Sequence, residues 1–206
     1  MALNFANNNS LSAITTKPSG LSGGALNLIS TQTASSSSTI SFTSGIDDTY
    51  DSYVFKFYDI HPATNNTDFQ FQADTGTNTN YNQTITSTCF EAYHNENDAD
   101  QGLGYRASGD QAQGTGFQDI GGGMGNENDN STVGTLTIFN PSSSVFVKHF
   151  IATTNYVYNS AYTDNHYVAG YINTATPLTR FQFKMSSGNI DSGVIKLYGI
   201  SYIQQQ

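Results

Sequence analysis

The stretch YVFKFYDI (residues 53–60) decides the fold class of this chain. Successive side chains of a β-strand point to opposite faces, so every second residue shares a face. Tyr53, Phe55 and Phe57 therefore lie together on one face, which we expect to be buried. His61-Pro62 follows the stretch and predicts its end, because proline has no N–H to donate to a sheet.

The same alternation recurs at short intervals along the chain. Phe69 and Phe71 share a face within residues 68–72. Residues 133–140 and 145–152 form two apolar runs joined by Asn-Pro-Ser-Ser-Ser, which predicts a hairpin. Further strands are expected at residues 39–42, 84–93, 117–120, 166–172, 178–185 and 194–203. The polar region 95–116 and the run Gly121-Gly122-Gly123 are expected to be loops.

Composition supports an all-β fold. Only 11% of the 206 residues are charged, against about 25% in an average globular protein. Good helix formers such as Glu, Lys and Arg are therefore scarce, while Thr, Tyr and Phe favour strands. We expect residues 39–206 to form a two-sheet β-sandwich, jelly-roll-like. An immunoglobulin-like sandwich is the alternative, without its usual tryptophan.

Residues 1–38 differ from the rest of the chain. They are rich in Ser, Asn and Gly, and their few aliphatic side chains are widely spaced. Such a segment cannot bury enough apolar surface to fold alone. We expect an extended N-terminal arm that lays these side chains on a neighbouring subunit, and the alternative is an unattached tail.

The segment SGVIKLYGI (residues 192–200) reads as a turn followed by the last strand of a β domain. Together with residues 42–46 and 50–57, it resembles a signature of virion structural proteins from tailed bacteriophages. The resemblance implies a non-enzymatic protein located in the virion. The resemblance leaves the role within the particle open, and we favour a capsid decoration (cement) protein that binds the major capsid protein as a homo-oligomer, with a trimer favoured.

Three other functions stay open. The first is a component of the tail, such as a fibre, a tube-attached protein or a receptor-binding protein, with a tail protein as partner. The second is a carbohydrate-binding module. The weakest is a hydrolase with an unrecognised active site.

The charge of the chain argues against nucleic acid as a partner. The formal net charge is −9, with only seven Lys and Arg residues to neutralise phosphates. Residues 1–7 have neither the basic region nor the apolar stretch of a secretory signal. No window approaches the roughly 20 apolar residues that span a bilayer, so no membrane partner is expected.

No residue stands out as catalytic, cofactor-binding or metal-ligating. Cys89 is the single cysteine, and we expect it to be a buried apolar residue. The four histidines, His61, His94, His149 and His166, share no spacing typical of a zinc site. Glu91 and the other glutamates belong to no motif of paired catalytic carboxylates.

Two features leave binding open. The tetrapeptide Asn-Glu-Asn-Asp occurs twice, and the loops Asn95–Asp100 and Asn126–Asn130 offer oxygen ligands of the kind that calcium takes. Solvated turns are the simpler interpretation. Five tyrosines lie close together in the sequence and suit ordinary strands, a subunit interface or a carbohydrate-facing surface. They are Tyr156, Tyr158, Tyr162, Tyr167 and Tyr171.

Overall fold

The computed structural model describes residues 26–200, which contain thirteen strands and no helix. The predicted all-β class is confirmed. Among these residues there is accordingly no helix with the length and apolarity needed to cross a membrane. The strands are β1 (Leu26–Ser37), β2 (Ile40–Phe42), β3 (Ser52–Pro62), β4 (Thr67–Thr75), β5 (Ile85–Asn95), β6 (Gln101–Tyr105), β7 (Ala112–Gly114), β8 (Gln118–Met124), β9 (Thr132–Phe139), β10 (Lys148–Tyr158), β11 (Tyr162–Ile172), β12 (Leu178–Met185) and β13 (Ile190–Ile200).

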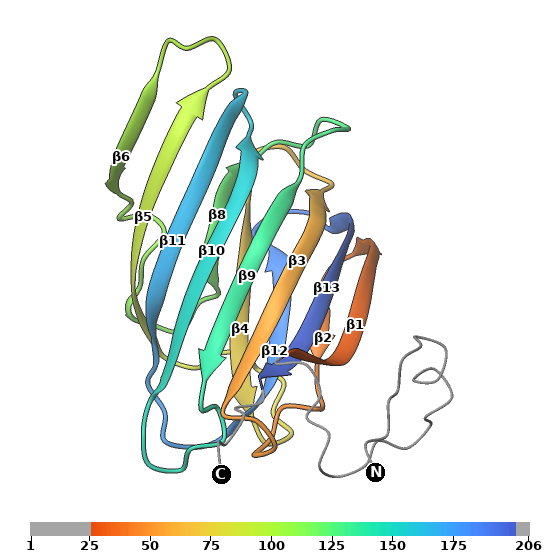
Figure 1. The fold of residues 1–206 in the computed structure, drawn as a ribbon, viewed down its shortest axis with the longest axis vertical. Helices are drawn as coiled ribbons and strands as arrows, with labels where there is room; N and C mark the ends of the chain where they lie inside the picture. Colours follow the sequence, from red (N-terminus) through yellow and green to blue (C-terminus); the bar gives the residue numbers. More distant parts are fainter. Residues whose placement is uncertain (1–25, 201–206) are drawn as a thin grey trace, which may run out of the picture.

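The strands lie in two facing layers (Figure 1). The wide front layer has the order β6-β5-β11-β10-β9-β3-β13-β1, with β7 also paired to β5. The smaller back layer has the order β8-β4-β12-β2. All strand pairs are antiparallel, including those at both edges.

The layers belong to one connected sheet. β10 continues past the start of β9, and its last residue, Tyr158, pairs with Met124 of β8. At the opposite side, β1 and β2 are the two ends of the strand path and only Ser38 and Thr39 separate them. The sheet therefore folds back and nearly closes on itself, so the predicted division into two separate sheets is not confirmed.

A cluster of phenylalanines fills the space between the layers and is called here the phenylalanine core. Phe55 of β3 lies 5.0 Å from Phe183 of β12, and Phe57 lies 5.1 Å from Phe69 of β4, as ring centroid distances. Edge-to-face pairs of this kind stabilise beyond their buried area. The inward face predicted from alternation at residues 53–60 is confirmed. The members of the core, all buried, are Phe42, Phe55, Phe57, Phe69, Phe71, Phe150, Phe181 and Phe183.

The predicted hairpin between residues 133–140 and 145–152 is also confirmed. β9 and β10 pair from Phe150↔Ile138 to Tyr156↔Thr132. The second strand begins later than expected, at Lys148, and runs on to Tyr158. Its additional residues reach beyond the phenylalanine core.

The N-terminal arm expected at residues 1–38 is not confirmed over its described part. Residues 26–37 form β1, which pairs with β13 from Leu26↔Ile200 to Ser37↔Ile190. The edge of β13 offers backbone hydrogen bonds, so this polar segment needs no apolar core of its own to become a strand. The boundary expected after residue 38 therefore falls inside the sheet. Residues 1–25 of the expected arm lie outside the described residues.

Two expected loops contain strands instead. The region 95–116 holds the short edge strands β6 and β7, and Gly121-Gly122-Gly123 lies within β8. A Cβ atom at Gly122 would come within 2.6 Å of the Arg106 guanidinium, so a side chain from another segment occupies the space above the glycine. A glycine run shows no alternation of side chains, which is why only the start of this strand, within residues 117–120, was predicted.

Candidate functional site

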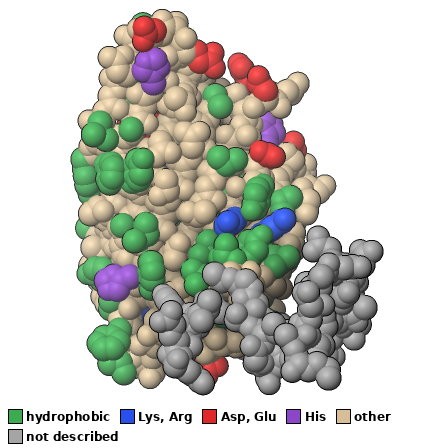
Figure 2. Space-filling model, viewed as in Figure 1, with side chains coloured by type: hydrophobic (Ala, Val, Ile, Leu, Met, Phe, Trp, Pro, Cys, Tyr) green, Lys and Arg blue, Asp and Glu red, His purple; other side chains and the backbone are tan. Residues whose placement is uncertain are grey.

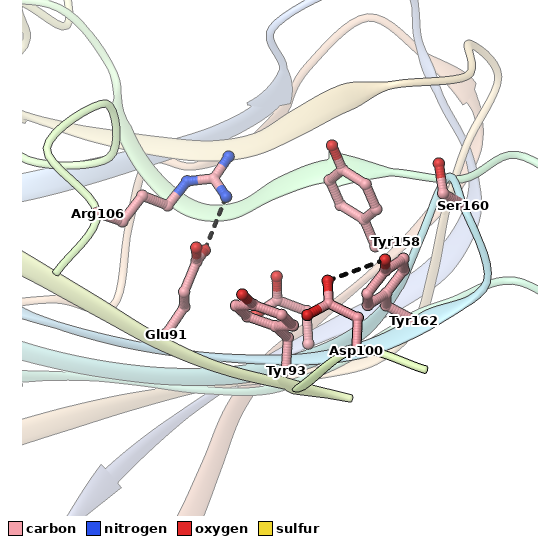
Figure 3. A pocket seen from close by; sticks show the side chains of 8 residues that line it. Glu91, Tyr93, Asp100, Arg106, Tyr158, Ser160 and Tyr162 are labelled. Atoms are coloured by element: carbon pink, nitrogen blue, oxygen red, sulfur yellow. Dashed lines mark hydrogen bonds and ion pairs between the residues drawn. The ribbon is translucent and has the colours of Figure 1, made fainter. Parts of the chain in front are cut away.

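A cleft of about 330 Å³ opens where β5, β10 and β11 extend beyond the back layer (Figures 1 and 3). We call it the tyrosine cleft. Side chains of the front-layer strands β5, β10 and β11 form most of its wall. The lining residues are Glu91, Tyr93, Asp100, Arg106, Tyr158, Ser160, Tyr162 and Asp164.

Strand register brings the polar residues of the cleft together. β5 and β11 pair with Glu91 opposite His166 and Tyr93 opposite Asp164. Residues at alternating positions share a face, so all four side chains point inward. His166 is fully buried, whereas Glu91 and Asp164 reach the cleft.

An ion pair closes one side of the cleft. Arg106 Nη1 donates to Glu91 Oε2 at 2.7 Å (Figure 3). Arg106 follows β6, and its backbone N–H donates to the carbonyl of Cys89 at 2.9 Å, which fixes where the side chain starts. Burial by itself would lower the pKa of Arg106. The hydrogen bond to Glu91 and the nearby acidic groups have a larger, opposite effect, so the pKa of Arg106 is raised.

His166 is fully buried behind Glu91 and Asp164, next to the cleft. Its Nε2 lies 2.7 Å from the Tyr156 hydroxyl and 3.1 Å from Glu91 Oε2. Burial lowers the pKa of His166 to about 4, and the charge of Arg106 acts in the same direction. The imidazole is therefore neutral at pH 7.

Asp164 is a buried carboxyl beside this imidazole. Its Oδ1 lies 3.8 Å from His166 Nε2 and has no hydrogen-bond partner. Burial raises the pKa of Asp164 to about 6, and the negative charge of Glu91 adds to the effect. Nearly all buried polar atoms in proteins are paired, so this oxygen requires an explanation.

Three tyrosine rings form the apolar part of the wall (Figure 3). Tyr162 lies edge-on to Tyr93 and to Tyr158, with ring centroids 5.9 and 6.0 Å apart. The Tyr162 hydroxyl donates to Asp100 at 3.2 Å. Gly123 has a φ of +69°, and a Cβ there would overlap the Tyr158 ring, so this glycine lets the ring lie against β8. Flat rings beside carboxylates and a guanidinium suit a polar ligand with some apolar surface.

The tyrosines grouped in the sequence divide between two faces. Tyr158 and Tyr162 line the cleft, and Tyr156 is buried below it. Tyr167 points outward and stacks on Phe90, with ring centroids 4.7 Å apart. Tyr171 is also on the outward side, near His149.

The remaining residues singled out in the sequence lie apart from the cleft. Cys89 is buried, and burial raises the pKa of its thiol to about 12, as suits an unreactive apolar residue. His94 Nε2 lies 3.2 Å from Asp98 at the surface, and His61 Nδ1 lies 2.9 Å from the carbonyl of Asn130. These histidines therefore do not combine into one site.

The two loops considered for calcium lie at one end of the molecule. Glu96, Glu127 and Asp129 border a shared cavity of about 350 Å³. In the first loop, Asn95 Oδ1 accepts hydrogen bonds from the backbone of Ala99 and Asp100, so it supports a turn. Calcium binding by these loops stays a prediction.

Among the described residues, one group of His, Cys, Asp or Glu side chains has ligand atoms close enough for a metal ion. It consists of Glu91, Asp164 and His166, whose atoms lie within 4.8 Å of one another. Sequence reasoning did not select this group. The signal was Asp164-x-His166 within a strand, which places both side chains on one face, but the third member comes from the neighbouring strand.

Comparison with family models, with curated proteins and with solved structures gives no match to this chain.

Proposed function

We propose that this protein is a structural component of a tailed-phage virion, a capsid decoration protein that assembles as a homo-oligomer, with a trimer favoured. The observation that supports this most is the outer face of the front layer (Figure 2). Apolar side chains are spread over it, and acidic groups gather at one end of the view. The apolar residues of this outer face include Tyr58, Phe90, Val133, Ile151 and Tyr167, all exposed by more than a third of their surface.

The outer face has the chemistry of a contact surface. Phe90 is 44% exposed and Ile151 is 51% exposed, on strands that bury their other face. Exposed apolar groups gathered on one face are typical of protein interaction sites, and aromatic residues are enriched at interfaces. Lys56 and Lys196 lie over the tyrosine rings of Tyr198 and Tyr58, at 5.7 and 5.3 Å, which adds cationic contacts to the same face.

The resemblance of residues 192–200 to phage virion proteins supports the location in a virion. We read the two facing layers as a jelly-roll-like sandwich whose sheets are joined by the Tyr158–Met124 pair. Such a body presents a wide, stiff face to a capsid lattice. Repeated contacts over many copies make individually weak contacts effective.

The test is addition of the purified protein to expanded capsids that lack it. We expect saturation at a fixed ratio to the major capsid protein and a higher melting temperature of the capsid. The variant Phe90→Ser/Ile151→Ser should bind at least ten times more weakly and form smaller oligomers in light scattering. The matched control is Val145→Ser, which removes a 71% exposed apolar side chain from the loop between β9 and β10.

Two results would redirect the proposal. Location of the protein at the tail, in a few copies per particle, would favour the tail component. Equal capsid binding by the variant and the control would show that the outer face does not contact the capsid.

A second candidate function is carbohydrate binding. The observation that favours it is the tyrosine cleft, where Tyr93, Tyr158 and Tyr162 adjoin Asp100 and Arg106. Aromatic rings can stack on sugar faces, while charged groups accept or donate to hydroxyls. Tyr162→Ala should abolish glycan binding by the isolated protein without changing its oligomeric state, and a glycan array shows whether any binding exists.

A further inference from the structure

Three potential ligand atoms, one imidazole nitrogen and two carboxylate oxygens, converge beside the tyrosine cleft. His166 Nε2 lies 3.1 Å from Glu91 Oε2 and 3.8 Å from Asp164 Oδ1. The Tyr156 hydroxyl is a third oxygen, 2.7 Å from the same nitrogen. A neutral imidazole nitrogen either donates one hydrogen or accepts one, for example from the Tyr156 hydroxyl, so it can pair with only one of these three groups at a time.

The unsatisfied atom is identified directly. Asp164 Oδ1 is buried without a hydrogen-bond partner, and the Asp164 side chain is only 6% exposed. A buried carboxylate oxygen without a donor costs free energy unless a cation or a proton meets it. This oxygen faces the imidazole of His166, the ring whose other nitrogen, Nδ1, is also unpartnered.

We propose that Glu91, Asp164 and His166 bind a divalent transition-metal ion of the Zn²⁺ type beside the cleft. One imidazole nitrogen and two carboxylate oxygens form a three-ligand set of the kind that holds zinc with a position left for water or substrate. The tyrosine cleft gives access to that position, because Glu91 and Asp164 line it.

The two donor separations that involve His166 are close to those of ligands on one ion, and all three ligand atoms lie within 4.8 Å of one another. With metal–ligand bonds of about 2.1 Å, neighbouring ligand atoms lie roughly 3.0–3.4 Å apart. The separation from His166 Nε2 to Glu91 Oε2 is 3.1 Å, and that to Asp164 Oδ1 is 3.8 Å. A small rotation of the Asp164 carboxylate closes the longer separation, since no hydrogen bond restrains its Oδ1.

Surrounding residues fit an outer shell. Arg106 donates to Glu91 Oε2 and orients the carboxylate, and residues that position ligands in this way raise metal affinity. Arg106 also limits the charge of the site. Two carboxylates and one guanidinium leave one net negative charge before an ion binds.

The ligand set selects against calcium and magnesium. Calcium takes six to eight oxygen ligands, whereas this site offers one imidazole nitrogen and the carboxylate oxygens of Glu91 and Asp164. Imidazole favours zinc and related ions. The inference is independent of the proposed location in a virion.

The experiment is a titration of the full chain with Zn²⁺ by calorimetry after removal of metal with a chelator. We expect one ion per chain and a higher melting temperature with Zn²⁺, because a ligand that binds only the folded state stabilises it. Asp164→Asn and Glu91→Gln should each weaken Zn²⁺ binding by at least ~10–100-fold, the loss typical of even outer-shell changes. Ca²⁺ and Mg²⁺ should not compete.

Two control variants separate this site from surface binding. His94→Gln removes an exposed His–Asp pair, and Asp100→Asn removes a carboxylate from the same cleft. Both should bind Zn²⁺ like the parent. Co²⁺ bound to the parent protein supplies a measurement that needs no variant, because its absorption spectrum reports nitrogen and oxygen ligands.

Absence of stoichiometric Zn²⁺ binding by the parent protein would overturn the proposal. So would equal affinity of the parent, Asp164→Asn and Glu91→Gln, or loss of binding with His94→Gln alone. If the ligand variants fail to fold, anomalous scattering from a zinc-soaked crystal of the parent decides the question by the position of the ion.

Discussion

The phenylalanine core and the tyrosine cleft have the same strand geometry but differ in what the inward-facing side chains contact. In the core, inward positions carry apolar rings that pack between two layers. Beside the cleft, the inward positions of β5 and β11 carry Glu91, Asp164 and His166, of which Glu91 and Asp164 line an open cavity. Alternation thus determines which side chains point inward, while the segments that pack opposite them determine whether they meet other rings or a cavity.

Removing a ring from the core should have the largest effect on stability. The centroid of Phe183 lies within 6.5 Å of those of Phe42, Phe55, Phe57, Phe69 and Phe71. Phe183→Ala should lower the free energy of unfolding by about 3–5 kcal/mol, as a cavity remains. Urea unfolding measures the loss. Phe146→Ala, at a 68% exposed residue, should change it by less than ~0.5 kcal/mol, and equal losses would contradict the assignment of the core.

A pH titration should reveal a partly buried carboxyl on β8, that of Asp119. Burial raises the pKa of Asp119 to about 6 from the ordinary 3.8. The folded state therefore holds this proton more tightly than the unfolded chain, so stability falls as pH rises from about 4 to 6. About two pKa units correspond to roughly 3 kcal/mol.

The matched variant for this titration is Asp119→Asn, which keeps an oxygen for the hydrogen bond from Gln70. Between pH 4 and pH 6, the unfolding free energy of this variant should fall by less than that of the parent, because the contribution of Asp119 is missing. Identical pH profiles for the variant and the parent would show that the folded state leaves this pKa unshifted.

Breaking the ion pair beside the cleft should cost less than a core ring. Glu91→Ala leaves Arg106 without the partner at 2.7 Å, and we expect a loss of about 2 kcal/mol in metal-free buffer. Adding Arg106→Ala should restore part of that stability, because the unpaired charge is gone. Thermal unfolding of the four members of this double-mutant cycle gives the coupling energy between Glu91 and Arg106. Strictly additive losses would show that the two side chains do not stabilise each other.

The smallest effect is expected at the glycine beneath the cleft wall. Gly123→Ala places a Cβ against Tyr158 at a φ of +69°, and we expect a loss of about 1.5 kcal/mol. Gly104→Ala is the control, since nothing lies within 4 Å of a Cβ there. Chemical unfolding of both variants makes the comparison, and a loss no greater at position 123 than at 104 would contradict the close approach of the ring.

Parts of the fold could be predicted because their signal is local. Alternation at residues 53–60 and 178–185 identified β3 and β12 with the correct inward faces. β1 could not be found in this way, because its residues become a strand only through hydrogen bonds to β13, some 160 positions later in the chain. Only the start of β8 was predicted, because its glycines make room for Arg106 and Tyr158 and show no pattern of their own.

The cleft shows the same limit. Tyrosines at positions 158 and 162 were noticed as a group, and the structure places both in the cleft wall. Glu91 was considered only as an isolated acid, and His166 only as one histidine without a spacing motif. Their meeting depends on the register of β5 with β11, in which Glu91 lies opposite His166. Register is a property of strand pairing and cannot be predicted from either strand alone.

The amino-acid sequence by itself determined that this chain is built from strands and which side of several strands is buried, because side-chain alternation and composition act over a few neighbouring residues. Only the tertiary structure decided that the strands join into one sheet that nearly closes, that residues 26–37 are part of it, and that an acid, an imidazole and a second acid converge beneath three tyrosines. These outcomes depend on pairings between distant segments, and hydrogen bonds between strands become specific only when the whole sheet is assembled.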